Sequence, residues 1–97
     1  MLKITVCENQ GMQTIKLEGK IGGAWVHELE RTWSALRLSL GSKKLQLDLR
    51  EVTFADVNGR ELLREIYHKT HAGFLTDSPL TEYFADEARQ PRKHEGE

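Results

Sequence analysis

The chain has 97 residues, and its 14 Lys and Arg residues against 15 Asp and Glu residues give a formal net charge of −1. A chain of this length forms one domain with a modest core and has no room for a deep cleft between lobes. The balanced charge argues against a nucleic-acid-binding domain, which would normally carry a basic surplus. The single cysteine, Cys7, can form neither an internal disulfide nor a cysteine-based zinc site.

Three segments alternate between apolar and polar residues, which is the pattern of strands with one buried face. They are residues 2–6, 14–18 and 44–50. The polar stretch that ends in Gly11 predicts a turn joining the first two strands as an antiparallel hairpin. The first alternation is too short for a signal peptide, which needs about 7–15 apolar residues in a row, or for a membrane helix of about 20. We therefore expect a cytoplasmic protein without membrane insertion.

The first of three predicted helices lies between Gly23 and Gly41. Its apolar residues recur every three or four positions, at Val26, Leu29, Trp33, Leu36 and Leu40. Gly41 supplies the left-handed residue at which such a helix ends. Trp33 fits the buried stripe, whereas Trp25 at the start of the helix is expected to be partly exposed.

The second helix is expected to begin near Asn58, with Glu61 completing a capping box, and to end at Gly73. A short strand over residues 73–76 follows. Ser78 and the proline after it are the usual residues at a helix start, so a third helix is predicted over residues 80–88.

The resulting order, β-β-α-β-α-β-α, predicts an α/β two-layer sandwich. Its four-stranded mixed sheet would contain an antiparallel first hairpin followed by parallel crossovers. Because the strands alternate in polarity, the helices are expected mainly on one face. Residues 1–89 form the expected domain, and residues 90–97 form a polar tail that we expect to be disordered.

The most informative segment is residues 47–59, where the third strand passes into the second helix. It carries the pattern D-L-x-x-V-x-F-x-D-x-x-G, followed by a pair of leucines in the helix. The residues of the pattern are Asp48, Leu49, Val52, Phe54, Asp56 and Gly59, with Leu62 and Leu63 after them. This segment resembles the signature of STAS domains, which include the anti-sigma factor antagonists of bacteria and the cytoplasmic modules of sulfate transporters.

The resemblance implies a non-catalytic protein-interaction module without a cofactor. The antagonists of that family bind a serine-kinase anti-sigma factor through this junction, and phosphorylation of a serine just before the glycine switches them off. Asn58 occupies that position here and has no hydroxyl to phosphorylate, so the serine switch is absent. We expect Arg60 and Arg64 to lie on the outer side, where they would meet acidic residues of the partner. The residues expected to bind the partner are Thr53, Asp56, Val57, Asn58, Gly59, Arg60, Leu63 and Arg64.

These residues also have ordinary structural interpretations, because Asp56 and Asn58 are common turn and cap residues and Phe54 and Val57 suit a core. The functional alternative is an accessory module of a transporter complex or a domain that senses a small ligand or lipid. A cavity lined by Trp25, Phe54 and Tyr67 would favour it. An enzyme ranks third, because no nucleophile motif, phosphate-binding loop or metal-binding cluster is recognisable.

Two further features complete the sequence-based picture. His68 and His71 are three residues apart, but no third ligand accompanies them, so solvated histidines are expected rather than a metal site. The resemblance also implies that one strand and one helix are missing after the third helix. The strand around Phe74 would then be a sheet edge, open to a homodimer contact.

Overall fold

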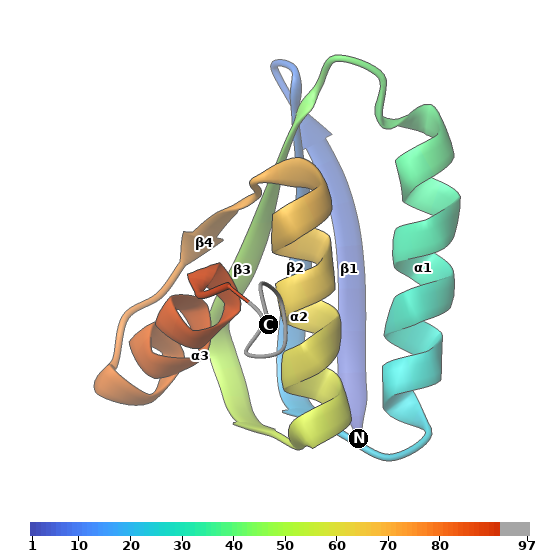
Figure 1. The fold of residues 1–97 in the computed structure, drawn as a ribbon. Coiled ribbons are helices and arrows are strands. Elements are labelled where there is room, and N and C mark those ends of the chain that lie inside the picture. The colour runs from blue at the N-terminus through green and yellow to red at the C-terminus, as the bar shows by residue number, and fades with distance from the viewer. Residues whose placement is uncertain (92–97) are drawn as a thin grey trace.

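The structure is a computed structural model that describes residues 1–91. Its elements are β1 (Leu2–Asn9), β2 (Met12–Ile21), α1 (Trp25–Leu40), β3 (Lys44–Ala55), α2 (Val57–Thr70), β4 (Gly73–Leu75) and α3 (Pro79–Arg89). The sheet order is β1-β2-β3-β4 (Figure 1). β1 is antiparallel to β2, and the other neighbours are parallel. The predicted element order and mixed sheet are therefore confirmed. The expected disordered tail falls almost wholly outside the described residues.

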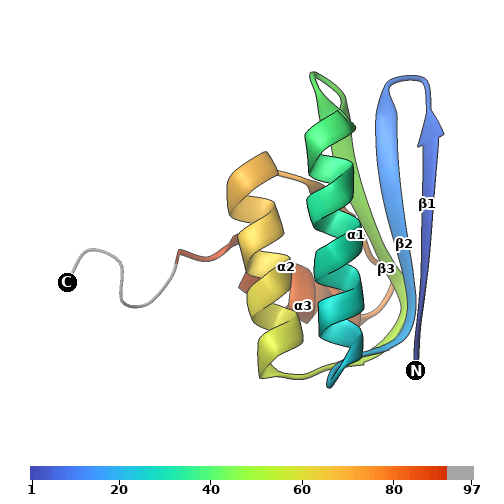
Figure 2. The ribbon, with the colours of Figure 1, turned by 90° about the vertical axis from the view of Figure 1, so that its right-hand side faces the viewer.

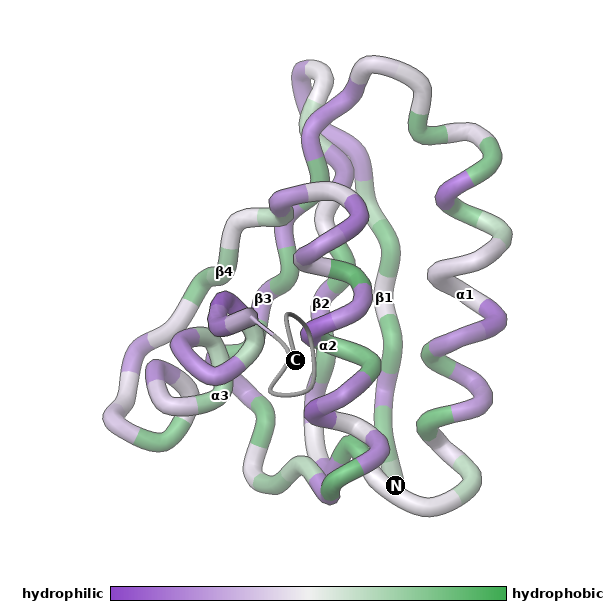
Figure 3. The backbone as a smooth tube through the Cα atoms, in the orientation of Figure 1, coloured by the Kyte–Doolittle hydropathy of each residue, from purple (hydrophilic) through white to green (hydrophobic). Residues whose placement is uncertain are grey.

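All three helices lie on one side of the sheet (Figure 2), as the alternating strands predict. Apolar and polar residues alternate along the strands and recur in patches along the helices (Figure 3). Leu47 and Leu49 of β3 are fully buried, and they form the core together with Trp33 of α1 and Ile66 of α2. The other face of the sheet carries polar side chains such as Lys16, because no helix covers it.

The ends of α1 and α3 follow the sequence-based prediction. Gly41 lies directly after α1 with a φ of 59°. Ser78 caps α3 by accepting a hydrogen bond from the Thr81 N–H, and the two residues form a capping box. The two tryptophans also have the predicted exposure, since Trp33 is buried and Trp25 is 38% exposed.

The start of α2 differs from the prediction. The cap is Asp56, two residues before Asn58, because Asp56 has an extended backbone and its carboxylate accepts a hydrogen bond from the Gly59 N–H. Asn58 instead lies in the first turn of the helix. The helix also ends earlier than expected, at Thr70, because His71 adopts a left-handed conformation with a φ of 55°.

β3 extends beyond the predicted end of the strand, to Ala55. Its register against β2 shifts twice, once between Lys16 and Glu18 and once between Gly19 and Lys20. Each shift inserts an extra residue into β3, so the simple alternation breaks after the predicted segment.

The expectation that Phe54 and Val57 belong to the core is wrong. Phe54 is 49% exposed and Val57 is 63% exposed. After the second bulge of β3, Ala55 takes the inward position in place of Phe54. Val57 is on the outer side of the first turn of α2, where the buried positions are Gly59 and Leu62.

Candidate functional site

Asp56 joins three parts of the chain at the junction between β3 and α2. Its carboxylate accepts a hydrogen bond from the Gly59 N–H at 2.8 Å and another from the Gly23 N–H at 3.0 Å. Its own N–H donates to the Ile21 carbonyl at 3.0 Å. The bonds from Gly59 and Gly23 hold the pKa of the Asp56 carboxyl below its ordinary value, because they favour the charged form. The junction is therefore held to the end of β2 and to the loop before α1.

Two glycines permit this close approach. A Cβ atom at Gly59 would lie 2.5 Å from the Ile21 carbonyl oxygen, so any side chain there would push α2 away from β2. A Cβ atom at Gly22 would lie 3.1 Å from the Asp56 Oδ2 atom. Gly59, the glycine of the sequence pattern, is buried and therefore has a packing role at the junction.

Between residues 53 and 58, four side chains are exposed. They are Thr53 and Phe54 at the end of β3, and Val57 and Asn58 in the first turn of α2. The site lies beyond the carboxyl ends of the parallel strands β2 and β3, which is where open α/β sheets commonly bind their partners and ligands. We call these four residues the junction surface.

The two arginines predicted to meet a partner are used inside the chain. Arg60 donates to the Ala55 carbonyl at 2.7 Å and forms an ion pair with Glu87 of α3 at 3.0 Å. The Arg64 side chain is only 13% exposed and is paired with Glu61 at 2.7 Å. Arg64 also donates to the Glu87 carbonyl of α3 at 3.4 Å, so both arginines attach α2 to neighbouring segments instead of lying on the outer side.

Leu63 is another residue that the sequence placed in the contact set, and it is fully buried. Together with Gly59 it belongs to the inner side of α2. Neither residue can touch a partner docked on the folded domain, so their role at this site is to position the helix.

A groove that the sequence analysis missed adjoins the junction surface. It has a volume of about 370 Å³ and lies between α1 and α2. Its lining includes Asn58 of the junction surface and the carboxylates of Glu30, Glu61 and Glu65. No pattern within one helix reveals it, because the groove exists only when the two helices pack together.

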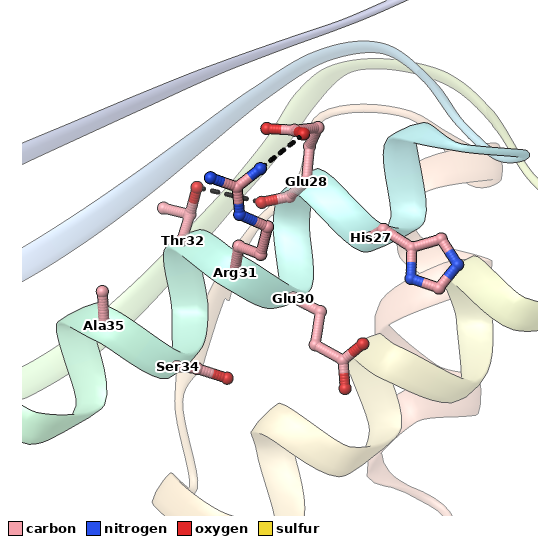
Figure 4. Close-up of a pocket in the computed structure, with 7 residues that line it drawn as sticks. All are labelled: His27, Glu28, Glu30, Arg31, Thr32, Ser34 and Ala35. Atoms are coloured by element: carbon pink, nitrogen blue, oxygen red, sulfur yellow. Dashed lines mark hydrogen bonds and ion pairs between the residues drawn. The ribbon is translucent and has the colours of Figure 1, made fainter.

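A wider hollow next to this groove follows a single helix. All seven of its lining residues come from α1, and Figure 4 shows them along the outer surface of that helix. Arg31 pairs with Glu28 at 3.1 Å, while His27 and Glu30 lie on the side that faces α2. The hollow is an open helix surface, so it offers no enclosed site.

The ligand cavity considered from the sequence does not form. Tyr67 lies ten residues after Val57 on α2, about 15 Å along the helix. There it stacks on Phe74 of β4 with ring centroids 6.0 Å apart. Trp25 and Phe54 remain near the other end of the helix, so the three aromatic rings cannot line one cavity.

The histidines of α2 also have local contacts. His68 lies 3.0 Å from the Gln90 carbonyl oxygen through its Nε2 atom, and the His71 ring packs edge-on against Tyr67. Among residues 1–91, no group of three His, Cys, Asp or Glu side chains is arranged to hold a metal ion. Within the same residues, no helix has the length and apolar character needed to cross a membrane.

Comparison with solved structures gives a clear similarity. An anti-sigma factor antagonist from Mycobacterium paratuberculosis superposes with a TM-score of 0.73 and 24% sequence identity, over 86% of this chain and 74% of that one. The chain has the fold of an anti-sigma factor antagonist. The resemblance inferred from the residues of the junction is thereby confirmed at the level of the fold.

A second similarity is to the Mglu crystal structure. Its TM-score is 0.61 and its sequence identity 19%, over 77% of this chain but only 19% of the Mglu chain. The likeness therefore concerns one part of a larger protein and shows that this fold also occurs inside longer chains. No protein-family model and no curated protein sequence matches the chain.

Proposed function

We propose that this chain is a non-catalytic regulatory module that binds a protein partner through the junction surface. The observation that carries the proposal is the exposure of Val57 and Asn58 on a helix turn that Asp56 holds in place. A rigid, partly apolar surface loses little conformational entropy on binding. The fold similarity to an anti-sigma factor antagonist supports a regulatory partner, and an anti-sigma factor is the leading candidate.

The contact energy of this surface would come mainly from its apolar members. Phe54 and Val57 are large or branched side chains that the fold leaves half exposed or more. Burying these side chains against a partner would remove their apolar surface from water and so stabilise the complex. Asn58 would contribute a neutral polar contact beside them.

The identity of residue 58 also defines the proposed regulation. Phosphorylation of a serine would add a charge of about −1.5 to −2 at the start of α2. The amide of Asn58 accepts no phosphate ester, so binding through this surface would not be switched off at this position. The module would act constitutively unless another residue or the amount of protein controls it.

The test is affinity capture from cells of the source organism with matched variants as bait. Val57→Asp and Asn58→Asp should each reduce capture of the partner about tenfold or more, which corresponds to about 1.4 kcal/mol. Leu38→Lys is the control, because Leu38 is 89% exposed near the other end of α1. Circular dichroism must show that all three variants are folded. Equal capture by wild type and both junction variants would overturn the proposal.

A second candidate function is the sensing of a small cationic molecule in the groove between α1 and α2. Its volume of about 370 Å³ is large enough for a small ligand, and three carboxylates line it. A thermal-shift screen with amines and other small molecules tests this function. A ligand-dependent rise in the unfolding temperature that Glu30→Gln abolishes would support ligand sensing. If no compound shifts the unfolding temperature, the protein-binding function remains as the proposal.

A further inference from the structure

The two edges of the sheet differ in length and protection. β4 forms one edge with only three residues. β1 forms the other with eight residues, and it pairs with β2 over its whole length without a shift in register. It contains no proline. Natural proteins usually shorten, bend or cover such an edge, because its backbone groups can pair with another strand.

The register shows which backbone groups of β1 point outward. The Lys20 N–H donates to the Met1 carbonyl, and Lys3, Thr5 and Cys7 lie opposite residues of β2 in the same alternating set. In an antiparallel pair, alternate residues direct both their N–H and their C=O groups to the neighbouring strand. The remaining set therefore directs its groups to the outer edge, and this set comprises Leu2, Ile4, Val6 and Glu8.

The side chains of the same set face the helix-covered side of the sheet. Leu2 is buried, Ile4 packs partly against the core, and Val6 is left 42% exposed. Figure 2 views the sheet along its edge and shows β1 as an outer strand, with the helices on one side of the sheet. The core therefore ends at β1 with apolar surface that a further strand would cover.

We propose that β1 pairs with β1 of a second copy of this chain in antiparallel orientation. The two four-stranded sheets would then become one continuous sheet across a two-fold axis. Ile4 of one chain would lie opposite Val6 of the other as a hydrogen-bonded pair. Thr5 would lie on the axis opposite Thr5 of the second copy, as a non-hydrogen-bonded pair.

Only residues whose backbone groups point outward can form hydrogen-bonded pairs with the second strand. The possible registers are therefore those that pair even-numbered residues of one β1 with even-numbered residues of the other. The register centred on Thr5 pairs Ile4 with Val6 and overlaps most of the strand. A shift by one step toward the end of β1 would place Ile4 opposite Glu8, and a shift toward its start would shorten the overlap. The register centred on Thr5 is therefore favoured over the first shift by apolar pairing and over the second by length.

Charge does not oppose pairing with a second copy. In this register Lys3 lies opposite Cys7 and Glu8 lies opposite Leu2, so no like charges face each other across the two strands. The net charge of −1 adds little general repulsion between two copies.

Cysteine cross-linking tests both the contact and its register. In a Cys7→Ser background, Thr5→Cys places two thiols on the two-fold axis with Cα atoms about 4.5 Å apart, within the range for a disulfide. Lys3→Cys is the matched control, because two residues at position 3 would be about 14 Å apart, too far for a disulfide. Mild oxidation should give a covalent dimer with Thr5→Cys and none with Lys3→Cys.

Sedimentation equilibrium provides the second measurement. The wild type should be a dimer at tens of micromolar. Val6→Pro should be a monomer, because it removes an N–H that points outward and leaves the bonds between β1 and β2 intact. Val6→Thr retains that N–H and should remain a dimer.

The outcomes separate clearly. A monomeric wild type, or a dimer in which Thr5→Cys does not cross-link in preference to Lys3→Cys, overturns the proposal. If Val6→Pro does not fold, the cross-linking comparison decides alone, since neither cysteine variant disturbs the strand pairing. Loss of capture by the junction variants leaves this result unaffected, because the junction surface lies on β3 and α2 and includes no residue of β1.

Discussion

The carboxylate of Asp56 accepts a hydrogen bond at 3.0 Å from the backbone N–H of Gly23, a residue 33 positions earlier in the chain. The same carboxylate caps α2 through Gly59. One side chain thus fixes the start of α2 and ties it to the loop that precedes α1. The junction surface owes its rigidity to this link, so changes at Asp56 should alter stability and binding together.

Replacing Asp56 with asparagine should lower the stability of the domain in a pH-dependent manner. Asn58 and the other junction residues remain, but the amide offers one oxygen where the carboxylate offered two. Because the pKa of Asp56 is lowered in the folded state, the charged group contributes stability above the pKa of the unfolded state, about 3.9. That contribution disappears as the pH falls through the lower, folded-state pKa.

Urea unfolding of wild type and Asp56→Asn from pH 7 to pH 3 measures this effect. The difference in unfolding free energy should be constant between about pH 5 and 7 and should shrink below about pH 4. Asp48, whose pKa is also lowered, chiefly by its hydrogen bond with Arg50, is present in both proteins and cancels in the difference. A difference that grows as the pH falls would contradict the assigned role of Asp56.

Gly59→Ala should destabilise the domain although alanine is the better helix former. The new Cβ would meet the Ile21 carbonyl oxygen at 2.5 Å, and overpacking of this kind costs about 1–3 kcal/mol. Gly73→Ala is the matched control, because nothing lies within 4 Å of its added Cβ. Urea unfolding of both variants gives the comparison. Equal stability of Gly59→Ala and wild type would show that the helix can move without cost.

Much of the fold follows from residue patterns that are local. The alternation of Leu45, Leu47 and Leu49 predicts β3, and the Ser78-Pro79 pair predicts the start of α3. The motif around Asp56 predicts the fold itself through its resemblance to STAS domains, and the superposed antagonist structure agrees. These features depend on residues that are close together in the sequence, so a single sequence is enough to predict them.

The details of the candidate site depend on contacts between distant segments. The bulges of β3 place Ala55 inward and leave Phe54 exposed, and their positions come from the register against β2. The Asp56 carboxylate, besides capping α2 through Gly59, accepts a hydrogen bond from the N–H of Gly23 in a distant loop. Arg60 points inward because α3 brings Glu87 to it. No helical or strand periodicity contains this information.

Thr81→Val should cost about 1–3 kcal/mol of stability, because it removes one hydroxyl that serves several partners. The Thr81 hydroxyl accepts from the N–H groups of Asp77 and Ser78, both at 3.2 Å, and it is buried. Valine fills the same space but leaves those groups without this partner. Thr32→Val removes a hydroxyl bonded only to the Glu28 carbonyl on the exposed side of α1, so it should change stability by no more than about 0.5 kcal/mol. Thermal unfolding followed by circular dichroism should rank the two variants in this order, and the reverse order would refute the role of Thr81.

A double-mutant cycle on Arg60 and Glu87 should show that this pair acts within the domain. Their side chains are 29% and 24% exposed, and the ion pair joins α2 to α3 at 3.0 Å. Arg60→Met and Glu87→Gln, alone and together, should give an interaction energy of about 0.5–3 kcal/mol in urea unfolding. The more exposed pair Arg89 and Asp86 is the control, and it should give about 1 kcal/mol or less.

The same variants separate stability from partner binding. Arg60→Met should lower the unfolding free energy while the folded protein still captures its partner, because the guanidinium is engaged with Ala55 and Glu87. Val57→Asp should show the opposite behaviour, with normal stability and weak capture, since its side chain is 63% exposed. If Arg60→Met lost capture at a temperature where it is fully folded, Arg60 would have to be returned to the contact surface.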